Sequence, residues 1–311
     1  MNGIKNVGVV IPTYNAGENF NLLLESLYKQ DDIDIKLLVI DSQSDDGTVG
    51  KTANYPDIEV LGISKSDFNH GGTRNIGLNF FKERGFDIVV FLTQDVILQG
   101  NKSLFNLVNA LNDHSVCAVS GRQVPHIDAN PLASHARIFN YPEFSCCNTY
   151  LDHTAKGLKV AFISNSYAAY RIDVLTRLGG FPSNTILAED MFVAAKALLA
   201  NYKVAYQADA VVQHSHNYSP IQEFKRYFDI GVFHACEPWI QEKLGGAHGE
   251  GAKFVKSELA YLWRHSPSWI PYAFVTTFCK FLGYKFGLNY KHIPTALRPK
   301  FGMYKSYWNQ Q

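Results

Sequence analysis

The sequence predicts an α/β protein built on a mainly parallel sheet and followed by a C-terminal helical extension. Short continuous runs of β-branched and apolar residues alternate with segments whose apolar side chains recur at helical spacing. This alternation is typical of βαβ units, whose parallel strands are buried on both faces. With 311 residues, 46% of them hydrophobic, the chain is long enough to bury such a core.

The predicted elements follow one another as strand, turn and helix. The strands cover residues 7–12, 35–41, 58–64 and 87–95, and the helices cover 18–30, 71–84 and 191–200. Ligands of such sheets bind where the strands end and lead into helices. Polar residues gather at three of these ends, where we expect a binding site: Thr13, Tyr14 and Asn15, then Asp41 and Ser42, then Gln94 and Asp95.

Composition excludes several classes of protein. The 29 Lys and Arg nearly balance the 28 Asp and Glu, so the net charge of +1 gives no sign of a nucleic-acid partner. Five cysteines without C-x-x-C spacing imply neither a disulfide framework nor a thiolate zinc site, which fits a reducing compartment. The first residues lack the apolar stretch of a signal peptide. We therefore expect a cytoplasmic protein that begins folding at its first strand.

Two motifs suggest a nucleotide ligand, although each has a simpler alternative. Asp41 opens the loop DSQSDDGT, where its carboxylate can accept a hydrogen bond from the N3–H of a pyrimidine or cap the next helix. In FNHGGTRN, Gly71 and Gly72 would let an anion approach the first N–H groups of a helix, and Arg74 could add a bidentate fork. The alternative is an ordinary helix start with a surface arginine. No Rossmann fingerprint or P-loop occurs.

Three side chains suggest a metal. Asp95 separates two apolar runs and is either a structural cap or a ligand of a divalent cation that neutralises a departing diphosphate. One carboxylate with phosphate oxygens and water suits Mg²⁺. In VVQHSHNYS, His214 and His216 lie on one side of an extended chain. A histidine beside Asp95 would favour Mn²⁺.

The segment LAEDMFVAAKA places two acids at the start of a helix. Glu189 and Asp190 either stabilise the helix dipole or supply a general base that takes the proton of an attacking hydroxyl. The residues alone leave both interpretations open.

Together these motifs resemble a known family. Seven ordered segments carry the resemblance: VIPTYNAG, LLVIDSQSDDGT, FNHGGTRNIG, FLTQDVIL, GRQVPH, LAEDMFVAAKA and HSHNYS. They are similar to the bacterial rhamnosyltransferases of glycosyltransferase family 2, above all to those of O-antigen synthesis. The resemblance continues through RYFDIGVFHACEPWI and FLGYKFG to MYKSYWN, so it covers nearly the whole chain.

The resemblance implies a GT-A fold, an inverting mechanism, a dTDP-L-rhamnose donor and an undecaprenyl-diphosphate-linked acceptor of O-antigen synthesis. It implies a catalytic region over 1–220, with a donor half 1–121 and an acceptor half 122–220, then a membrane-associating region over 221–311. A homo-oligomer is compatible with it. It assigns Thr13, Tyr14, Asn15, Asp41 and Ser42 to the base and ribose, and Gly72, Arg74 and Gln94 to the donor diphosphate region. Asp95 falls to Mg²⁺ or Mn²⁺, His214 or His216 to the metal or the diphosphate, and Asp190 to the general base. Glu189 is expected to orient Asp190 or to bind the acceptor.

One departure from the family pattern concerns the metal. The family at large has an Asp-x-Asp motif, whereas the matching triplet here is Thr93, Gln94 and Asp95. The first carboxylate is lost, which weakens the expectation of tight metal binding.

Two other functions compete with this interpretation. A nucleotidyltransferase would share the sheet and the metal, but it would usually carry a basic glycine-rich loop after its first strand. Here that loop, TYNAGENF, has no Lys or Arg. A non-catalytic sugar-binding protein would form no product with any donor.

The C-terminal residues suggest contact with the cytoplasmic face of the inner membrane. From Leu259 to Gln311 there are seven Lys or Arg, no Asp or Glu, and fourteen of the 42 aromatic residues, among them Trp263, Trp269 and Trp308. Basic residues mixed with Trp and Tyr suit a helix in the membrane interface. We expect Lys280, Lys285, Lys291 and Lys300 to contribute to binding. The alternative is that the aromatic residues only pack helices onto the catalytic region.

Overall fold

A mixed nine-stranded sheet forms the centre of the computed structural model, which describes residues 6–246 and 249–309. Its strand order is β3-β2-β1-β4-β8-β6-β9-β5, and β7 pairs with β9. The strands are β1 (Val7–Thr13), β2 (Ile35–Asp41), β3 (Ile58–Gly62), β4 (Ile88–Leu92), β5 (Ile97–Leu98), β6 (Val116–Val124), β7 (Cys146–Asn148), β8 (Tyr167–Arg171) and β9 (Lys203–Gln213).

The first four long strands form a parallel block, as the sequence predicts. β1 pairs in parallel with both β2 and β4, and β2 with β3. β8 then runs antiparallel to β4 and β6, while β6 and β9 are parallel. The carboxyl ends of β1, β2 and β4 therefore lie at one edge of the sheet, where the polar residues were expected to meet.

Two apolar layers cover the sheet, because successive side chains of a buried strand point to opposite faces. Val9 of β1 packs with α1 and α3 on one face, and Val10 packs with α2, α6 and α7 on the other. The helices are α1 (Asn19–Tyr28), α2 (His70–Glu83), α3 (Ser103–Asn109), α4 (Pro131–Asn140), α5 (His153–Lys156), α6 (Ile172–Arg177), α7 (Glu189–Leu199), α8 (Pro220–Cys236), α9 (Pro238–Leu244), α10 (Glu250–His265), α11 (Ile270–Leu288), α12 (Arg298–Phe301) and α13 (Lys305–Asn309).

The predicted elements are present, with small shifts at their ends. The helix expected over 71–84 begins at His70, because the side chain of Asn69 caps it by accepting a hydrogen bond from the N–H of Gly72. The strand expected over 87–95 stops at Leu92, so the polar residues that follow lie in a loop.

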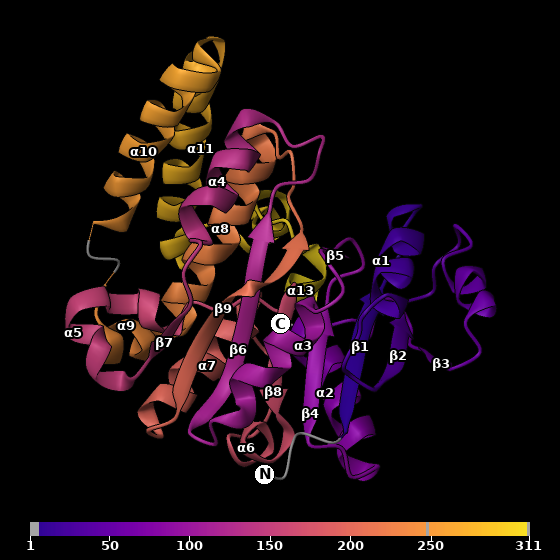
Figure 1. Cartoon of the computed structure of the whole chain (residues 1–311). Coiled ribbons are helices and arrows are strands. Elements are labelled where there is room, and N and C mark those ends of the chain that lie inside the picture. Colours follow the sequence, from indigo (N-terminus) through magenta and orange to yellow (C-terminus); the bar gives the residue numbers. More distant parts are fainter. Residues whose placement is uncertain (1–5, 247–248, 310–311) are drawn as a thin grey trace.

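The C-terminal helices stand at the end of the sheet toward which β6 and β9 point (Figure 1). There α4, α8, α10 and α11 rise beyond the strands. The expected boundary at residue 220 coincides with the start of α8, but the core does not divide there, since Phe228 and Val232 belong to the same apolar cluster as Val10. The division into domains stays a prediction. Among the described residues, no helix combines the length and the hydropathy that a bilayer span requires.

Glycines allow α8 and α11 to pack backbone against backbone. A Cβ atom added at Gly283 would lie 2.2 Å from the carbonyl oxygen of Phe224, and one at Gly287 would lie 2.1 Å from that of Phe228. Backbone atoms cannot move aside as the end of a flexible side chain can. This crossing therefore holds α8 and α11 at a fixed separation beside the cavity described below.

We predict that Gly283→Ala and Gly287→Ala each lower the free energy of unfolding by roughly 1–3 kcal/mol, the usual cost of overpacking. Gly251→Ala, on α10 with open space around it, is the matched control and should leave stability unchanged or slightly raised. Urea titrations of the three variants and of wild type measure the free energies of unfolding. Equal stability of all three variants would show that the crossing tolerates a wider separation.

Candidate active site

The three strand ends meet as the sequence predicts, and hydrogen bonds join them. The hydroxyl of Thr13 donates to Asp41 Oδ1 over 2.8 Å, which links β1 to β2. The side chain of Gln94 accepts from the N–H of Tyr14 at 2.7 Å and donates to its carbonyl at 3.1 Å, which links β1 to the loop after β4. Gln94 therefore fixes the backbone of Tyr14, while the ring of Tyr14 stays partly exposed beneath Lys65, 4.3 Å away.

Asp41 is buried and organises its own loop. It accepts hydrogen bonds from Thr13 and from both the N–H and the hydroxyl of Ser44. Ser42 is also buried, and its N–H donates to the carbonyl of Thr13, while Asn15 accepts from the N–H of Asp45. These residues shape the end of the sheet, and their contact with a nucleotide stays a prediction.

The double glycine of FNHGGTRN has a structural reason that the sequence did not reveal. A Cβ atom at Gly71 would lie 1.9 Å from the carbonyl oxygen of Pro182, so this glycine lets the chain before α7 cross the start of α2. The N–H of Gly72 is already bonded to Asn69, at 2.9 Å. The expectation that the pair leaves room for a diphosphate is therefore wrong for Gly71, and Gly72 has its donor engaged.

Arg74 is not the surface arginine of the simpler alternative. Its guanidinium donates to the carbonyl of His70 and forms an ion pair with Glu189, Nη1 to Oε1, at 3.1 Å. The two side chains are only 7% and 6% exposed. Burial, the largest single effect, raises the pKa of Glu189, but the charges of Arg74 and His70 and the hydrogen bond from Asn165 together outweigh it, and the pKa is lowered. The assignment of Arg74 to the diphosphate stays a prediction, and its guanidinium already has an ionic partner in Glu189.

Asp190 lies next to this pair and faces the cavity. Its carboxylate accepts hydrogen bonds from the N–H of Asn165 at 3.0 Å and of Met191 at 2.8 Å. Burial, and then the negative charge of Glu189, raise the pKa of Asp190 to about 7. A carboxylate with such a pKa can take a proton from a hydroxyl near neutral pH.

Asp95, His214 and His216 come together as predicted. Their ligand atoms all lie within 4.8 Å of one another, with His214 Nε2 3.6 Å from one oxygen of Asp95 and His216 Nε2 3.7 Å from the other. Nδ1 of His214 lies 2.9 Å from Gln123 Oε1, so that nitrogen carries the proton and Nε2 is free to bind a metal. Burial lowers the pKa of both histidines and keeps them neutral. This donor set fits Mn²⁺ or Mg²⁺.

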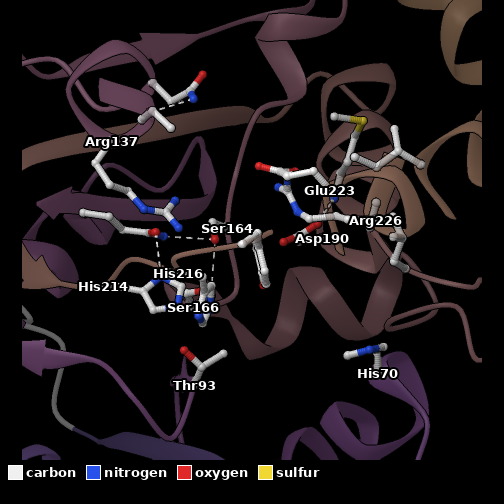
Figure 2. A pocket seen from close by; sticks show the side chains of 18 of the residues that line it. His70, Thr93, Arg137, Ser164, Ser166, Asp190, His214, His216, Glu223 and Arg226 are labelled. Atoms are coloured by element: carbon white, nitrogen blue, oxygen red, sulfur yellow. Dashed lines mark hydrogen bonds and ion pairs between the residues drawn. The ribbon is translucent and has the colours of Figure 1, made fainter. Parts of the chain in front are cut away.

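One cavity of about 860 Å³ joins these groups (Figure 2). Its walls include Tyr14, Gln94, the Asp95 cluster and Asp190, together with residues of the C-terminal helices. It also contains groups that the sequence analysis did not place at the site: Gln123, Arg137, Glu223, Arg226 and Lys280, the last of which was expected at the membrane. Gln123 stands in GRQVPH and Arg226 opens RYFDIGVFHACEPWI, two segments of the resemblance. Arg137, Glu223 and Lys280 stand in none of the quoted segments, so no signal placed them here.

Comparisons with known proteins agree with this geometry. Residues 8–179 match the family model Glycosyl transferase family 2, and residues 100–282 match Glycosyl transferase family group 2. The chain is 52% identical to the O-antigen chain rhamnosyltransferase RfbN of Salmonella typhimurium, with 97% of this chain and 96% of the relative covered. It is equally similar, at 52%, to the O-antigen chain rhamnosyltransferase WbaN of Salmonella anatum, over 97% and 95% of the two chains.

Solved structures share the fold at low identity. The mannosyltransferase PcManGT of Pyrobaculum calidifontis, in complex with GDP-Man and Mn²⁺, superimposes with a TM-score of 0.62 at 21% identity, over 92% of this chain and 88% of that one. TarS 1–349 of S. aureus in complex with UDP-GlcNAc gives a TM-score of 0.55 at 17% identity, over 98% and 88%.

We predict that Arg74→Met destabilises the protein by roughly 3–5 kcal/mol, because it leaves the buried charge of Glu189 unpaired. Adding Glu189→Gln should recover most of the loss, since glutamine can keep the hydrogen bond from Asn165. Arg177→Met, which breaks the exposed pair with Asp173, is the control and should change little. Chemical unfolding of wild type, the two single variants and the double variant measures these changes in stability. A double variant no more stable than Arg74→Met would contradict the account.

Proposed function

The chain belongs to glycosyltransferase family 2, has a GT-A-like fold and is an O-antigen chain rhamnosyltransferase, and from this premise we propose its donor, acceptor and mechanism. The donor is dTDP-L-rhamnose, and the acceptor is a sugar hydroxyl of an undecaprenyl-diphosphate-linked intermediate. The observation that carries the proposal is the placement of Asp190 and the Asp95 cluster in the walls of one cavity.

Asp190 is proposed as the general base. It takes a proton from the acceptor hydroxyl as that oxygen attacks the anomeric carbon from the face opposite the nucleotide. A single displacement of this kind inverts the anomeric centre, so a β-linked donor gives an α-L-rhamnoside. Glu189, whose carboxylate is held by Arg74 and Asn165, cannot act freely and instead raises the pKa of Asp190.

The departing diphosphate is proposed to lie at the Asp95 cluster. Asp95, His214 and His216 would hold Mn²⁺ or Mg²⁺, whose charge stabilises the leaving group. Gln123 keeps His214 in the tautomer that exposes Nε2. Arg137 of α4 adds a fixed positive charge, since Figure 2 shows it directed toward the histidines and its field lowers the pKa of both. Among the described residues its guanidinium has no carboxylate partner, which leaves it available for phosphate.

The nucleotide is proposed to bind along the ends of β1 and β2. Tyr14 lines the cavity and presents a partly exposed ring, with the ammonium of Lys65 above it. Thr13, Asn15, Asp41 and Ser42 hold the loops that would contact the base and ribose. Asp41 already accepts hydrogen bonds from Thr13 and Ser44, and its contact with the pyrimidine stays part of the proposal.

One assay tests the reaction. Purified protein is offered dTDP-L-rhamnose, UDP-galactose or GDP-mannose with a lipid-diphosphate-linked sugar, and the product is analysed by mass spectrometry and NMR. We expect rhamnose transfer with inversion, loss of activity in EDTA, and recovery with Mn²⁺ or Mg²⁺. Transfer from another sugar nucleotide would overturn the donor assignment, and no transfer from any donor would overturn the whole proposal.

The protein is proposed to bind the anionic surface of the inner membrane through α11. Apolar side chains recur along one side of this helix and are exposed: Phe274, Val275, Phe278, Phe281 and Phe286. We call these five residues the α11 stripe. No acid occurs after Leu259, so the surrounding charge is positive and suits anionic lipid.

The structure corrects part of the sequence-based expectation for the membrane. Lys280 is paired with Glu223 and only 12% exposed, so it cannot contact lipid, whereas Lys285, Lys291 and Lys300 are exposed. Trp269 and Trp308 pack against apolar clusters, and Trp263 alone of the three is largely exposed. The packing alternative therefore holds for Trp269 and Trp308, and membrane contact stays a proposal for the exposed residues.

We predict that Asp190→Asn lowers kcat by about 10²–10⁴ with little change in dTDP affinity. The wild-type kcat should rise with pH and level off above about 7, because only the ionised carboxylate accepts the proton and burial raises its pKa to about 7. The residual kcat of Asp190→Asn should not show this fall toward acidic pH. An unchanged pH profile in Asp190→Asn would assign the base to another group.

We predict that Phe278→Ser with Phe281→Ser weakens co-sedimentation with anionic liposomes at least about tenfold, since each buried Phe contributes roughly 1.5–3 kcal/mol. Phe144→Ser, a change of equal chemistry at an exposed site outside the α11 stripe, is the control. Unaltered liposome binding would refute the assignment. Loss of self-association in its place would show that the stripe contacts a second copy of the chain.

A further inference from the structure

The cavity has a second group of cations at its helical end. Arg226 of α8 and Lys280 of α11 approach the same carboxylate, that of Glu223, at 3.6 Å and 3.4 Å. All three side chains line the cavity. Figure 2 shows Glu223 and Arg226 near Asp190, across the cavity from His214 and His216. The group therefore lies beyond the proposed base, on the side away from the proposed leaving group.

These cations are incompletely satisfied within the part of the chain that the structure describes. Both distances to Glu223 exceed that of a good charged hydrogen bond, and Glu223 Oε2 is buried without a hydrogen-bond partner. The guanidinium of Arg226 lies near the rings of Tyr218 and Tyr227, and its side chain keeps 43% exposure, which faces the cavity. Side chains that carry charge and remain open to a cavity have capacity for a ligand.

The balance of charge at this end favours an anion. Behind Lys280 lies one more acid, Glu258, and its burial raises its pKa and so opposes its ionisation. At this end Arg226 and Lys280 outnumber Glu223, the one carboxylate that both approach. A positive excess in an enclosed site is unfavourable unless a ligand compensates it.

We propose that Arg226 and Lys280 bind the phosphate groups of the acceptor, a prenyl diphosphate that carries the sugar to be extended. This rests on the proposed function, in which the acceptor hydroxyl meets Asp190. Lys280 is held at the helical end by its ion pair with Glu223, at 3.4 Å. A ligand with its phosphate here and its sugar hydroxyl at Asp190 points away from the metal cluster.

The position of α11 agrees with a lipid-linked ligand. Lys280 faces the cavity, while Phe278 and Phe281 of the α11 stripe face outward on the same helix. One element thus brings a phosphate-binding cation and a lipid-facing surface next to each other. A free sugar acceptor would need neither.

Geranyl diphosphate is the probe, titrated calorimetrically into the protein in the presence of saturating dTDP. We expect binding, and a loss of about 10- to 100-fold in affinity in Arg226→Gln and in Lys280→Gln, the effect of a lost charged hydrogen bond. Lys256→Gln, exposed on α10 and outside the cavity lining, is the matched control and should bind like wild type. If Arg226→Gln fails to fold, the double variant Arg226→Gln with Glu223→Gln is measured in its place, because it leaves no unpaired carboxylate at residue 223.

The possible results separate the two proposals. This inference would be overturned if geranyl diphosphate did not bind the wild-type protein. It would also be overturned if the variants bound dTDP more weakly and the probe as well as wild type does, because both cations would then belong to the donor site. The titration needs no catalysis, so a protein that binds the probe through these residues but transfers no rhamnose refutes only the proposed function. In transfer assays the variants should raise the acceptor KM while the donor KM stays within about twofold.

Discussion

The site depends on one buried ion pair, between Arg74 of α2 and Glu189 of α7. Both charges are almost excluded from water, so each requires the other. The pair anchors the first residue of α7, and Asp190 follows directly. Arg74, with His70 and Asn165, favours the ionised form of Glu189. Burial raises the pKa of the adjacent Asp190, and the negative charge of Glu189 raises it further. Two neighbouring carboxylates thereby have their pKa values moved in opposite directions, which is how proteins divide structural and catalytic roles between like groups.

The same cavity has opposite electrostatic character at its two ends. The Asp95 cluster combines one carboxylate with two histidines kept neutral by burial, and so attracts a cation. The helical end carries Arg226 and Lys280 around a single Glu223, and so attracts an anion. Asp190 faces the space that joins them. A donor and an acceptor that both contain phosphate would otherwise compete for one site, and this division of charge gives each its own place.

Strand ends were predictable, whereas contacts between distant segments were not. Thr13 and Asp41 follow from the alternation of strands and helices, since parallel strands must end at one edge. The meeting of Asp95 with His214 and His216 was expected from an ordered set of motifs. In contrast, Gly71 is explained by the carbonyl of Pro182, and Arg74 by Glu189. Lys280, which composition grouped with membrane-facing lysines, turns inward. No periodicity encodes such pairs, because each depends on how two helices or loops cross.

In the proposed function, helix α11 couples the membrane to the chemistry through its two faces. Its glycine face packs on the backbone of α8 at Gly283 and Gly287, so the helix cannot move independently of the helix that carries Arg226. Its opposite face carries Phe278 and Phe281 outward. A surface bound by the α11 stripe would therefore hold Arg226 and Lys280 at a fixed depth. With a rise of about 1.5 Å per residue, Lys280 lies only about 3 Å along the axis from Phe278. A lipid embedded beside the stripe would thus have its phosphate groups close to the helical turn that carries Lys280.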